Sequence, residues 1–448
     1  MSRIFFISSN TMTVPYPVYP LGMAMVASAL DLAGHKVMQF DFLAEESSCY
    51  RLDTALRTFI PDIVGISLRN IDTVDSFTAD TAWALASVKG LMEVVRKATG
   101  APVVLGGAAF SIMPEDILAY LGADHGIVGD GVVLFNWLIE KIERGEQAPA
   151  IVRNDSGFHE EEMSFAPLWD KELVRYYTKK SGVVGLQTKR GCPNKCVYCT
   201  YPVIEGSHFR CREAGSVIED ILQLKTDHGI STISFTDSVF NDTHDFYLEI
   251  AEALLSRDVR IKWSAYFQPG RITRDNVGLL KRAGLYALEV GTDASSDTTL
   301  EGLDKPFCFD DVVHFNEACV NEEMPCVHYI MFGGPGETQE TIEEGLRNIA
   351  SLDKCVVIAF SGIRVFPGTQ LHAISVKDGI MASQDTLLKP VFYYSPEVDA
   401  AHLNETLRSG FRRKKNRIFP PEAFQAKVQL LYRFGDKGPL WHKMISFG

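Results

Sequence analysis

Long apolar runs and an excess of basic residues are both missing from this sequence of 448 residues. No apolar run reaches the roughly 18 residues that are needed to cross a bilayer, so we expect no membrane span. The N-terminal stretch lacks a charged leader followed by an apolar run and a cleavage site, so we expect a cytoplasmic protein. The formal net charge is −13, which makes nucleic acid an unexpected partner.

Cysteine is too scattered for a disulfide framework. The nine cysteines are an odd number in a long chain, whereas small secreted domains use dense and even sets. Reduced thiols in the cytoplasm fit this pattern better. Apolar residues make up 46% and charged residues 23% of the chain, which is ordinary globular composition, and the length allows roughly two to three domains.

Three cysteines do stand together, as Cys192, Cys196 and Cys199 in the string RGCPNKCVYCTYP. Thiolates of this kind hold iron–sulfur clusters, normally with one cysteine for each iron. Three ligands on a four-iron cluster leave one iron open to a substrate or cofactor. The spacing therefore predicts a cluster that takes part in chemistry.

Two simpler explanations of this string are a structural zinc site and a chance spacing. Structural zinc takes four protein ligands, usually as two pairs, but no second pair lies nearby and the string contains no histidine. Lys189, Arg190 and Lys195 also place positive charge beside the motif, as an anionic cluster would favour. The cluster is the preferred interpretation.

The first 145 residues alternate between expected strands and expected helices. We expect strands at 3–10, 35–42, 61–68, 101–107 and 125–131, and helices at 20–34, 51–60, 76–97, 114–121 and 132–144. Such alternation predicts a parallel sheet with helices on both faces. Five strands in this length fit an α/β flavodoxin-like doubly wound fold, which binds ligands at the carboxyl ends of its strands.

Small or polar residues occupy those strand ends and are candidate ligand contacts. They are Ser9, Asn10, Ser67, Leu68, Arg69, Asn70, Gly106, Gly107, Ala108, Gly129, Asp130 and Gly131. Small residues let a large flat ligand approach the backbone. No G-x-G-x-x-G string follows the first strand, so a dinucleotide is disfavoured. A nucleotide, a flavin or a receiver-type role remains open on these residues alone.

The remaining chain shows a second alternating region after a stretch without clear periodicity at 146–180. Strands are expected at 182–192, 232–241, 262–269, 286–295, 326–334 and 356–369, with helices at 216–229, 244–257, 273–284, 310–323 and 338–351. Residues 401–448 fall outside this pattern, and we expect them to form a small helical appendage.

The cysteine string, with an aromatic residue before its last cysteine, resembles that of the radical S-adenosylmethionine (SAM) enzymes. Together with the doubly wound domain before it, the string RGCPNKCVYCTYP resembles the subset with a cobalamin (B12)-binding domain, over nearly the whole chain. The resemblance implies a [4Fe-4S] cluster, SAM chelated by the open iron, cobalamin, and an external electron donor such as flavodoxin or ferredoxin. It also implies a cobalamin-binding domain at 1–145, a connector at 146–180, a partial (β/α)6 radical SAM barrel at 181–400 and the C-terminal helical appendage at 401–448.

The same resemblance assigns the strand-end residues of the first domain to cobalamin, together with the turn at Pro20, Leu21 and Gly22. Many cobalamin-binding domains use an Asp-x-His-x-x-Gly loop whose histidine ligates cobalt, and this sequence has none. The resemblance therefore implies base-off cobalamin without a histidine ligand. Arg69 is expected near the cobalt; the alternatives are a solvated side chain or a contact with the cofactor's tail.

For SAM, the resemblance implies contacts near the carboxyl ends of the barrel strands, where barrel enzymes place their chemistry. The implied residues are Tyr198, Asp237, Ser238, Glu289, Asp293, Gly333, Gly334 and Pro335. Helix capping is the alternative role for Asp237, and a tight turn is the alternative for the glycines.

The activity implied by the resemblance is cleavage of SAM to a 5′-deoxyadenosyl radical, which functionalises an unactivated carbon of a small molecule or lipid. C-methylation through methylcobalamin is the main expectation. Cyclisation, ring contraction and cyclopropanation are alternatives within the same chemistry. A non-catalytic redox or sensor protein is an alternative of another class. A methylthiotransferase is disfavoured, because Cys49 is the only cysteine before the motif.

Overall fold

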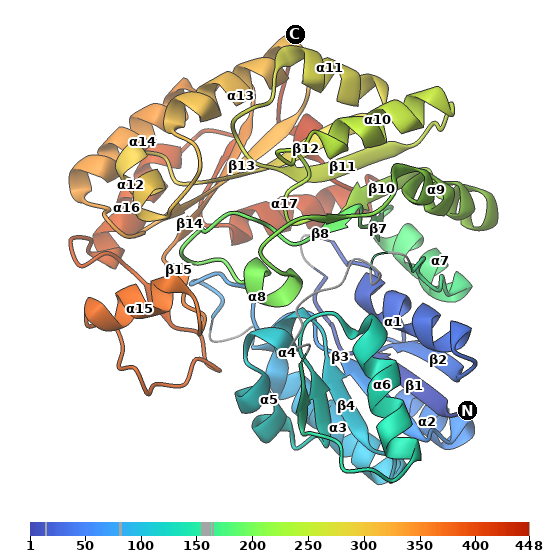
Figure 1. The fold of residues 1–448 in the computed structure, drawn as a ribbon. Helices are drawn as coiled ribbons and strands as arrows, with labels where there is room; N and C mark the ends of the chain where they lie inside the picture. Colours follow the sequence, from blue (N-terminus) through green and yellow to red (C-terminus); the bar gives the residue numbers. More distant parts are fainter. Residues whose placement is uncertain (14–15, 80–82, 154–162, 164, 448) are drawn as a thin grey trace.

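The computed structural model describes residues 1–13, 16–79, 83–153, 163 and 165–447. Two α/β halves lie one against the other, with the first half blue to teal and the second green to red in Figure 1. The first holds a six-stranded sheet in the order β2-β1-β3-β4-β5-β6, and the second a seven-stranded sheet in the order β17-β14-β13-β12-β11-β10-β7. Among the described residues, no helix has the length and apolar character that a membrane crossing requires.

The first half confirms the predicted doubly wound fold. Its strands are β1 (Arg3–Ser8), β2 (Lys36–Asp41), β3 (Ile63–Ser67), β4 (Val103–Gly106), β5 (His125–Ile127) and β6 (Ile151–Val152), and its helices are α1 (Leu21–Leu32), α2 (Cys49–Phe59), α3 (Ala84–Ala98), α4 (Ala108–Ile112), α5 (Pro114–Leu121) and α6 (Gly131–Glu143). Every strand pair is parallel. Helices cover both faces, which explains why β1 carries a nearly continuous apolar run.

Two segments differ from the expectation for this half. The helix expected at 76–97 begins only at Ala84, because the residues before it cross towards the second half. The connector at 146–180 supplies β6 and the helix α7 (Lys171–Lys180), while its residues 154–162 and 164 lie outside the described part of the chain.

The second half confirms the six predicted strands as parallel neighbours in an open barrel. They are β7 (Val184–Leu186), β10 (Thr232–Phe235), β11 (Lys262–Phe267), β12 (Leu285–Asp293), β13 (Cys326–Phe332) and β14 (Val356–Ser361). The helices that follow them are α9 (Ala214–His228), α10 (Phe246–Ser256), α11 (Arg274–Arg282), α12 (Asp297–Gly302), α13 (Phe309–Asn321), α14 (Gln339–Ser351) and α15 (Gln370–Lys377). Shorter elements are β8 (Lys189–Arg190), α8 (Tyr201–Glu205), β9 (Arg210–Cys211), β15 (Ile363–Arg364) and β16 (Phe392–Tyr393).

The C-terminal residues add a seventh strand that the sequence did not indicate. After α16 (Ala400–Phe411), β17 (Arg417–Ile418) pairs in parallel with β14. The helices α17 (Glu422–Arg433) and η2 (Trp441–Lys443) follow, and Phe424 stacks on Trp441 with ring centroids 4.9 Å apart. Both rings pack against residues near the amino ends of the barrel strands, including Ala287 and Val327. The C-terminal region therefore forms the floor of the barrel.

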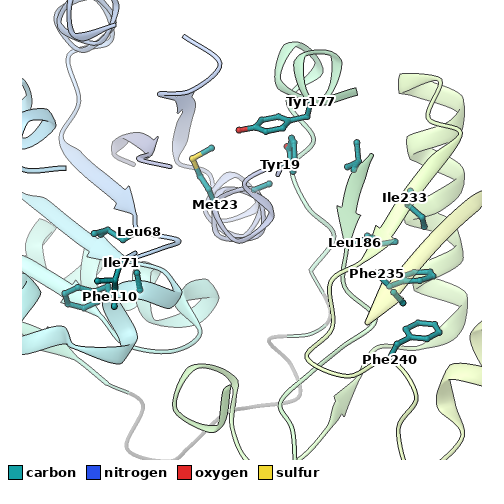
Figure 2. Packing of buried hydrophobic residues seen from close by; sticks show 14 of the residues in the cluster. Tyr19, Met23, Leu68, Ile71, Phe110, Tyr177, Leu186, Ile233, Phe235 and Phe240 are labelled. Atoms are coloured by element: carbon teal, nitrogen blue, oxygen red, sulfur yellow. The ribbon is translucent and has the colours of Figure 1, made fainter. Parts of the chain in front are cut away.

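A continuous apolar core joins the two halves. Tyr177 of α7 packs edge to face on Tyr19, with ring centroids 5.7 Å apart, and donates a hydrogen bond of 3.0 Å to Asp41. Figure 2 shows this tyrosine pair between Met23 of the first half and Leu186 of β7. The carboxyl ends of both sheets can therefore contribute to one shared site.

Candidate active site between the two domains

A cavity of about 580 Å³ lies between the two halves and gathers most of the predicted cluster and SAM residues. The barrel contributes Cys192, Cys196, Cys199, Tyr198, Asp237, Ser238, Glu289 and Asp293, and the first half contributes Arg69 and the segment 16–19. Gly333, Gly334 and Pro335 are not among its lining residues, so their contact with SAM stays a prediction.

The cysteine loop is held by its backbone, so its three thiols have fixed positions. The amide of Cys192 donates to the carbonyl of Gly206 at 3.1 Å, and that of Val197 donates to Leu303 at 3.1 Å. All three cysteines are free of disulfides. Burial raises the pKa of each thiol, that of Cys199 to about 12.

The donor set fits an iron–sulfur cluster. Thiolates are the ligands that such clusters take, one per iron, and here three thiols face one cavity. Among the described residues, no group of three or more His, Cys, Asp or Glu could hold a metal ion. A four-iron cluster does not need its thiolates to meet at one point, as a single metal ion does, because each thiolate binds a different iron.

Lys305 is a site residue that the sequence did not reveal. Its Nζ lies 3.4 Å from Cys196 Sγ and forms an ion pair with Asp293. Burial lowers the pKa of Lys305, but Asp293 and Cys196 together raise it further, so it stays charged. The residue lies in the loop after α12, where no periodic pattern could have marked it.

The irregular end of β12 directs the carboxylate of Asp293 towards Lys305. The strand register shifts between Gly291 and Asp293, and the φ angle of Asp293 is +65°, which is uncommon for a residue with a side chain. Its carboxylate accepts a hydrogen bond of 2.6 Å from Tyr198. Strain of this kind often marks functional positions, and here it places a carboxylate beside the cysteine loop.

Two residues predicted to contact SAM also hold the stem of the cysteine loop. Asp237 accepts from the Thr188 amide at 2.7 Å and lies 3.4 Å from the Nζ of Lys189, a fully buried lysine. Ser238 donates to the carbonyl of Gly191 at 2.7 Å. Both side chains line the cavity, so a contact with SAM remains a prediction beside this positioning role.

A chain of polar contacts links the first half to the residue before Cys192. Arg190 forms an ion pair with Asp130 and donates to Gln187 at 2.9 Å. Gln187 donates to Glu205 at 2.9 Å, and Glu205 accepts from the amide of Gly191 at 3.2 Å. The positive charge of Arg190 is therefore directed at the first half and not only at the cysteines.

A second cavity, of about 270 Å³, lies at the carboxyl ends of the first sheet. Most predicted cobalamin contacts line it: Leu21, Gly22, Ser67, Gly106, Gly107, Ala108, Gly129, Asp130 and Gly131. The barrel closes it with Gln187, Arg190 and Glu205, among others. Ser9, Asn10, Pro20, Leu68 and Asn70 are not among its lining residues.

The geometry of this cavity fits a group that approaches the backbone closely. Gly107 has φ +96°, and a Cβ there would lie 2.5 Å from the carbonyl oxygen of Leu68. At Gly106, by contrast, a Cβ would meet only the carbonyl oxygen of Ile127, at 3.9 Å, and would project into open space.

Arg69 faces the larger cavity. Burial lowers the pKa of its guanidinium, while Tyr201, Tyr16 and Tyr177 act in the opposite direction. No acidic group in the described part of the chain contributes to that shift. The side chain thus presents a cation to the space between the halves.

The glycine-rich turn after β13 is organised by a second residue that the sequence analysis missed. The carboxylate of Glu337 accepts from the amide of Gly334 at 3.1 Å and from that of Gly333. Burial raises the pKa of Glu337 to about 7, although the two amides lower it. Its place within the string GGPGET was the available signal.

Comparisons with known proteins agree with this architecture. The B12 binding domain family matches residues 7–137, and the radical SAM superfamily matches residues 186–349. A tryptophan 2-C-methyltransferase of Streptomyces laurentii is 24% identical, covering 78% of this chain and 71% of that protein. A cytidylyl-2-hydroxyethylphosphonate methyltransferase of Streptomyces wedmorensis is 22% identical, covering 91% and 89%.

A solved structure is similar over nearly the whole chain. The radical SAM methyltransferase TsrM from Kitasatospora setae, with cobalamin and a [4Fe-4S] cluster bound, has a TM-score of 0.84 and 21% identity, covering 99% of this chain and 97% of that one. Both domains occur in the same order here, with a cysteine loop at the barrel and a cavity at the first sheet. The chain therefore combines a B12 binding domain with a radical SAM domain, and it is similar over nearly its whole length to a cobalamin-bound radical SAM methyltransferase.

Proposed function

We propose that this protein transfers a methyl group to an unactivated carbon of a small molecule. The observation that carries the proposal is the meeting of three free thiols and Arg69 around one cavity between the two domains. The methyltransferases from Streptomyces laurentii and Streptomyces wedmorensis support methylation over cyclisation or ring contraction.

The residues divide between the cofactors as follows. Cys192, Cys196 and Cys199 would hold the cluster, and the glycine-lined cavity would take the tail of cobalamin. Arg69 would face the corrin ring. No histidine is among the described residues that line either cavity, which supports base-off cobalamin without a histidine ligand.

When bound, the cluster, SAM and cobalamin supply the electron, the radical and the methyl carrier. The protein itself holds charge and excludes water. Lys305 keeps a positive charge 3.4 Å from Cys196, which favours the reduced form of an anionic cluster. Tyr198 and Lys305 fix the carboxylate of Asp293 beside the same loop, so a ligand at the open iron would meet a preorganised acceptor.

The volume of the cavity and the net charge of the chain favour a small-molecule substrate. A space of about 580 Å³ between the domains is typical of small-molecule sites. The net charge of −13 disfavours nucleic acid. An external flavodoxin or ferredoxin would deliver the electron, which agrees with a reducing, cytoplasmic location.

The test is anaerobic turnover of the reconstituted protein with SAM, a reductant and deuterated candidate substrates. Deuterium should enter 5′-deoxyadenosine, and the methyl group of SAM should appear in the product. A variant with Cys192, Cys196 and Cys199 all replaced by Ala should lose both iron and SAM cleavage. SAM that stays intact in the loaded wild-type protein would favour the redox or sensor alternative.

A further inference from the structure

Glu289 occupies an unusual position on the inner face of the barrel. It lies in the middle of β12, opposite Tyr266 of β11 in the strand register, and lines the cavity between the domains. Five tyrosines lie close enough for its charge to raise their pKa values: Tyr16, Tyr266, Tyr286, Tyr329 and Tyr432. They come from five different segments of the chain, so the fold as a whole builds this surrounding.

No described cation neutralises this carboxylate. Its one hydrogen bond with the described residues is a long contact of 3.4 Å from the hydroxyl of Tyr329. Burial raises the pKa of Glu289 to about 7, with only that tyrosine opposing it. Lys305, the lysine that lines the same cavity, is already paired with Asp293. A half-buried carboxylate without a cationic partner is costly to ionise, which favours a partner that arrives with a ligand.

The aromatic rings around Glu289 indicate the charge of that partner. Tyr266 and Tyr329 are stacked, with centroids 5.9 Å apart and planes 12° apart, and Tyr16 and Tyr266 line the cavity together with Glu289. The faces of tyrosine rings attract cations, and aromatic cages are a recurring device for binding ammonium groups. A carboxylate within such a cage adds a direct ion pair. A substrate carboxylate or phosphate would be repelled.

Glu289 is also well separated from the residues beside the cysteines. Three residues of β12 lie between it and Asp293, and the four residue steps correspond to about 13 Å of strand. Asp293, Tyr198 and Lys305 form one polar group next to Cys196. A ligand at the open iron engages that group first, which leaves Glu289 for a different molecule.

We propose that Glu289 and the tyrosines around it bind a positively charged ammonium group of the substrate. This contact would hold the carbon to be methylated between the cofactors. This inference rests on the proposed methyl transfer and narrows its substrates to small amines. It reassigns Glu289 from SAM, where the family resemblance placed it, to the substrate.

The experiment compares paired probes on the holoenzyme loaded with cluster and cobalamin. 2-Phenylethylammonium is matched with 2-phenylethanol, and butylammonium with 1-butanol, by calorimetric titration at pH 8. In wild-type protein at least one ammonium probe should bind tenfold or more tightly than its neutral partner. Glu289→Gln should abolish that difference, and Tyr266→Leu should reduce it several-fold. Glu301→Gln, at an exposed position of α12, is the control and should retain it.

Two results would overturn the inference. One is equal binding of ammonium and alcohol probes in the wild-type protein, or a preference that survives in Glu289→Gln. The other is an affinity for SAM that falls in Glu289→Gln by as much as the affinity for the amine, which would assign the carboxylate to SAM. Failure of the proposed methyl transfer is recognised separately, because the methyl group of SAM is then absent from every product whichever probe binds.

Discussion

Arg364 of the barrel donates a hydrogen bond of 2.9 Å to Asp72 of the first domain, and both side chains are almost completely buried. The same guanidinium donates to the carbonyl of Leu387 at 2.7 Å. Ser76 and Trp83, from the same segment as Asp72, donate to the barrel carbonyls of Ser361 and Leu388. The loop after β3 is therefore the principal polar clamp between the domains in the described part of the chain.

Removal of Asp72 should strongly weaken the protein. Asp72→Ala leaves the Arg364 charge buried without its partner, which typically costs about 3–5 kcal/mol. The urea midpoint should fall clearly, and Asp72→Leu combined with Arg364→Met should recover much of the loss. Glu219→Ala, which removes an exposed pair with Arg257, should cost under about 1 kcal/mol. Equal effects of the two Ala variants would contradict the clamp.

A side chain at Gly106 should block cobalamin without unfolding the protein. The added Cβ would have only the Ile127 carbonyl oxygen nearby, at 3.9 Å, and would enter the smaller cavity. Gly106→Val should therefore reduce cobalamin retention tenfold or more while the melting temperature of the cofactor-free protein stays close to wild type. Gly100→Val, where a Cβ meets no described atom within 4 Å, is the control. Full retention in Gly106→Val would move the cofactor elsewhere.

Arg69 should affect the midpoint potential of the cobalt in bound cobalamin. Arg69→Lys retains the charge but loses the planar guanidinium, so the midpoint potential of the cobalt should shift. The paramagnetic spectrum of the cob(II)alamin form should show no coupling to a histidine nitrogen in either protein. Identical potentials would place Arg69 away from the corrin, and a histidine coupling would show that a protein histidine does ligate the cobalt.

Lys305 should affect the midpoint potential of the cluster. Lys305→Met removes a positive charge located 3.4 Å from Cys196 Sγ and nearly preserves the side-chain length. Because the reduced cluster is the more negative form, its midpoint potential should become more negative in this variant. Lys195→Met removes an exposed charge from the same loop and should shift the potential far less, since water and salt screen it. Redox titration followed by electron paramagnetic resonance distinguishes the two.

Glu289 should make stability depend on pH. Its pKa is raised from 4.5 to about 7 in the folded protein, so between these pH values the folded state binds more protons and stability falls as the pH rises. At pH 8, in the absence of substrate, Glu289→Gln should be more stable than wild type by up to about 3 kcal/mol. At pH 4.5 most of that difference should vanish. Urea midpoints at both pH values test this, and a difference independent of pH would exclude Glu289 as its source.

The sequence predicted what local patterns can encode. Alternating apolar segments located the parallel strands, and the cysteine spacing located the loop that lines the larger cavity. The turns at Gly106 and Gly129 located residues that line the smaller cavity, because small side chains at strand ends leave space beside the backbone. Each of these signals is contained in a few consecutive residues.

Long-range placement could not be predicted in the same way. The helix expected from residue 76 begins at Ala84 because Ser76 and Trp83 bond to the barrel. The strand β17 has only two residues, and it exists because β14 offers an unpaired edge. Lys305 and Glu289 acquire their roles from neighbours that the fold brings together, and no spacing in the sequence records those neighbours.

The floor of the barrel has a consequence for how such enzymes diversify. Phe424, Tyr432 and Trp441 come from the last helices of the chain, after the barrel strands that carry the cysteine loop. Of the five tyrosines around Glu289, Tyr432 is the one that this C-terminal stretch supplies, whereas Tyr266, Tyr286 and Tyr329 lie on the barrel strands themselves. Substitutions at Tyr432 can therefore adjust the surroundings of Glu289 from a part of the chain that is remote in sequence from the cysteine loop.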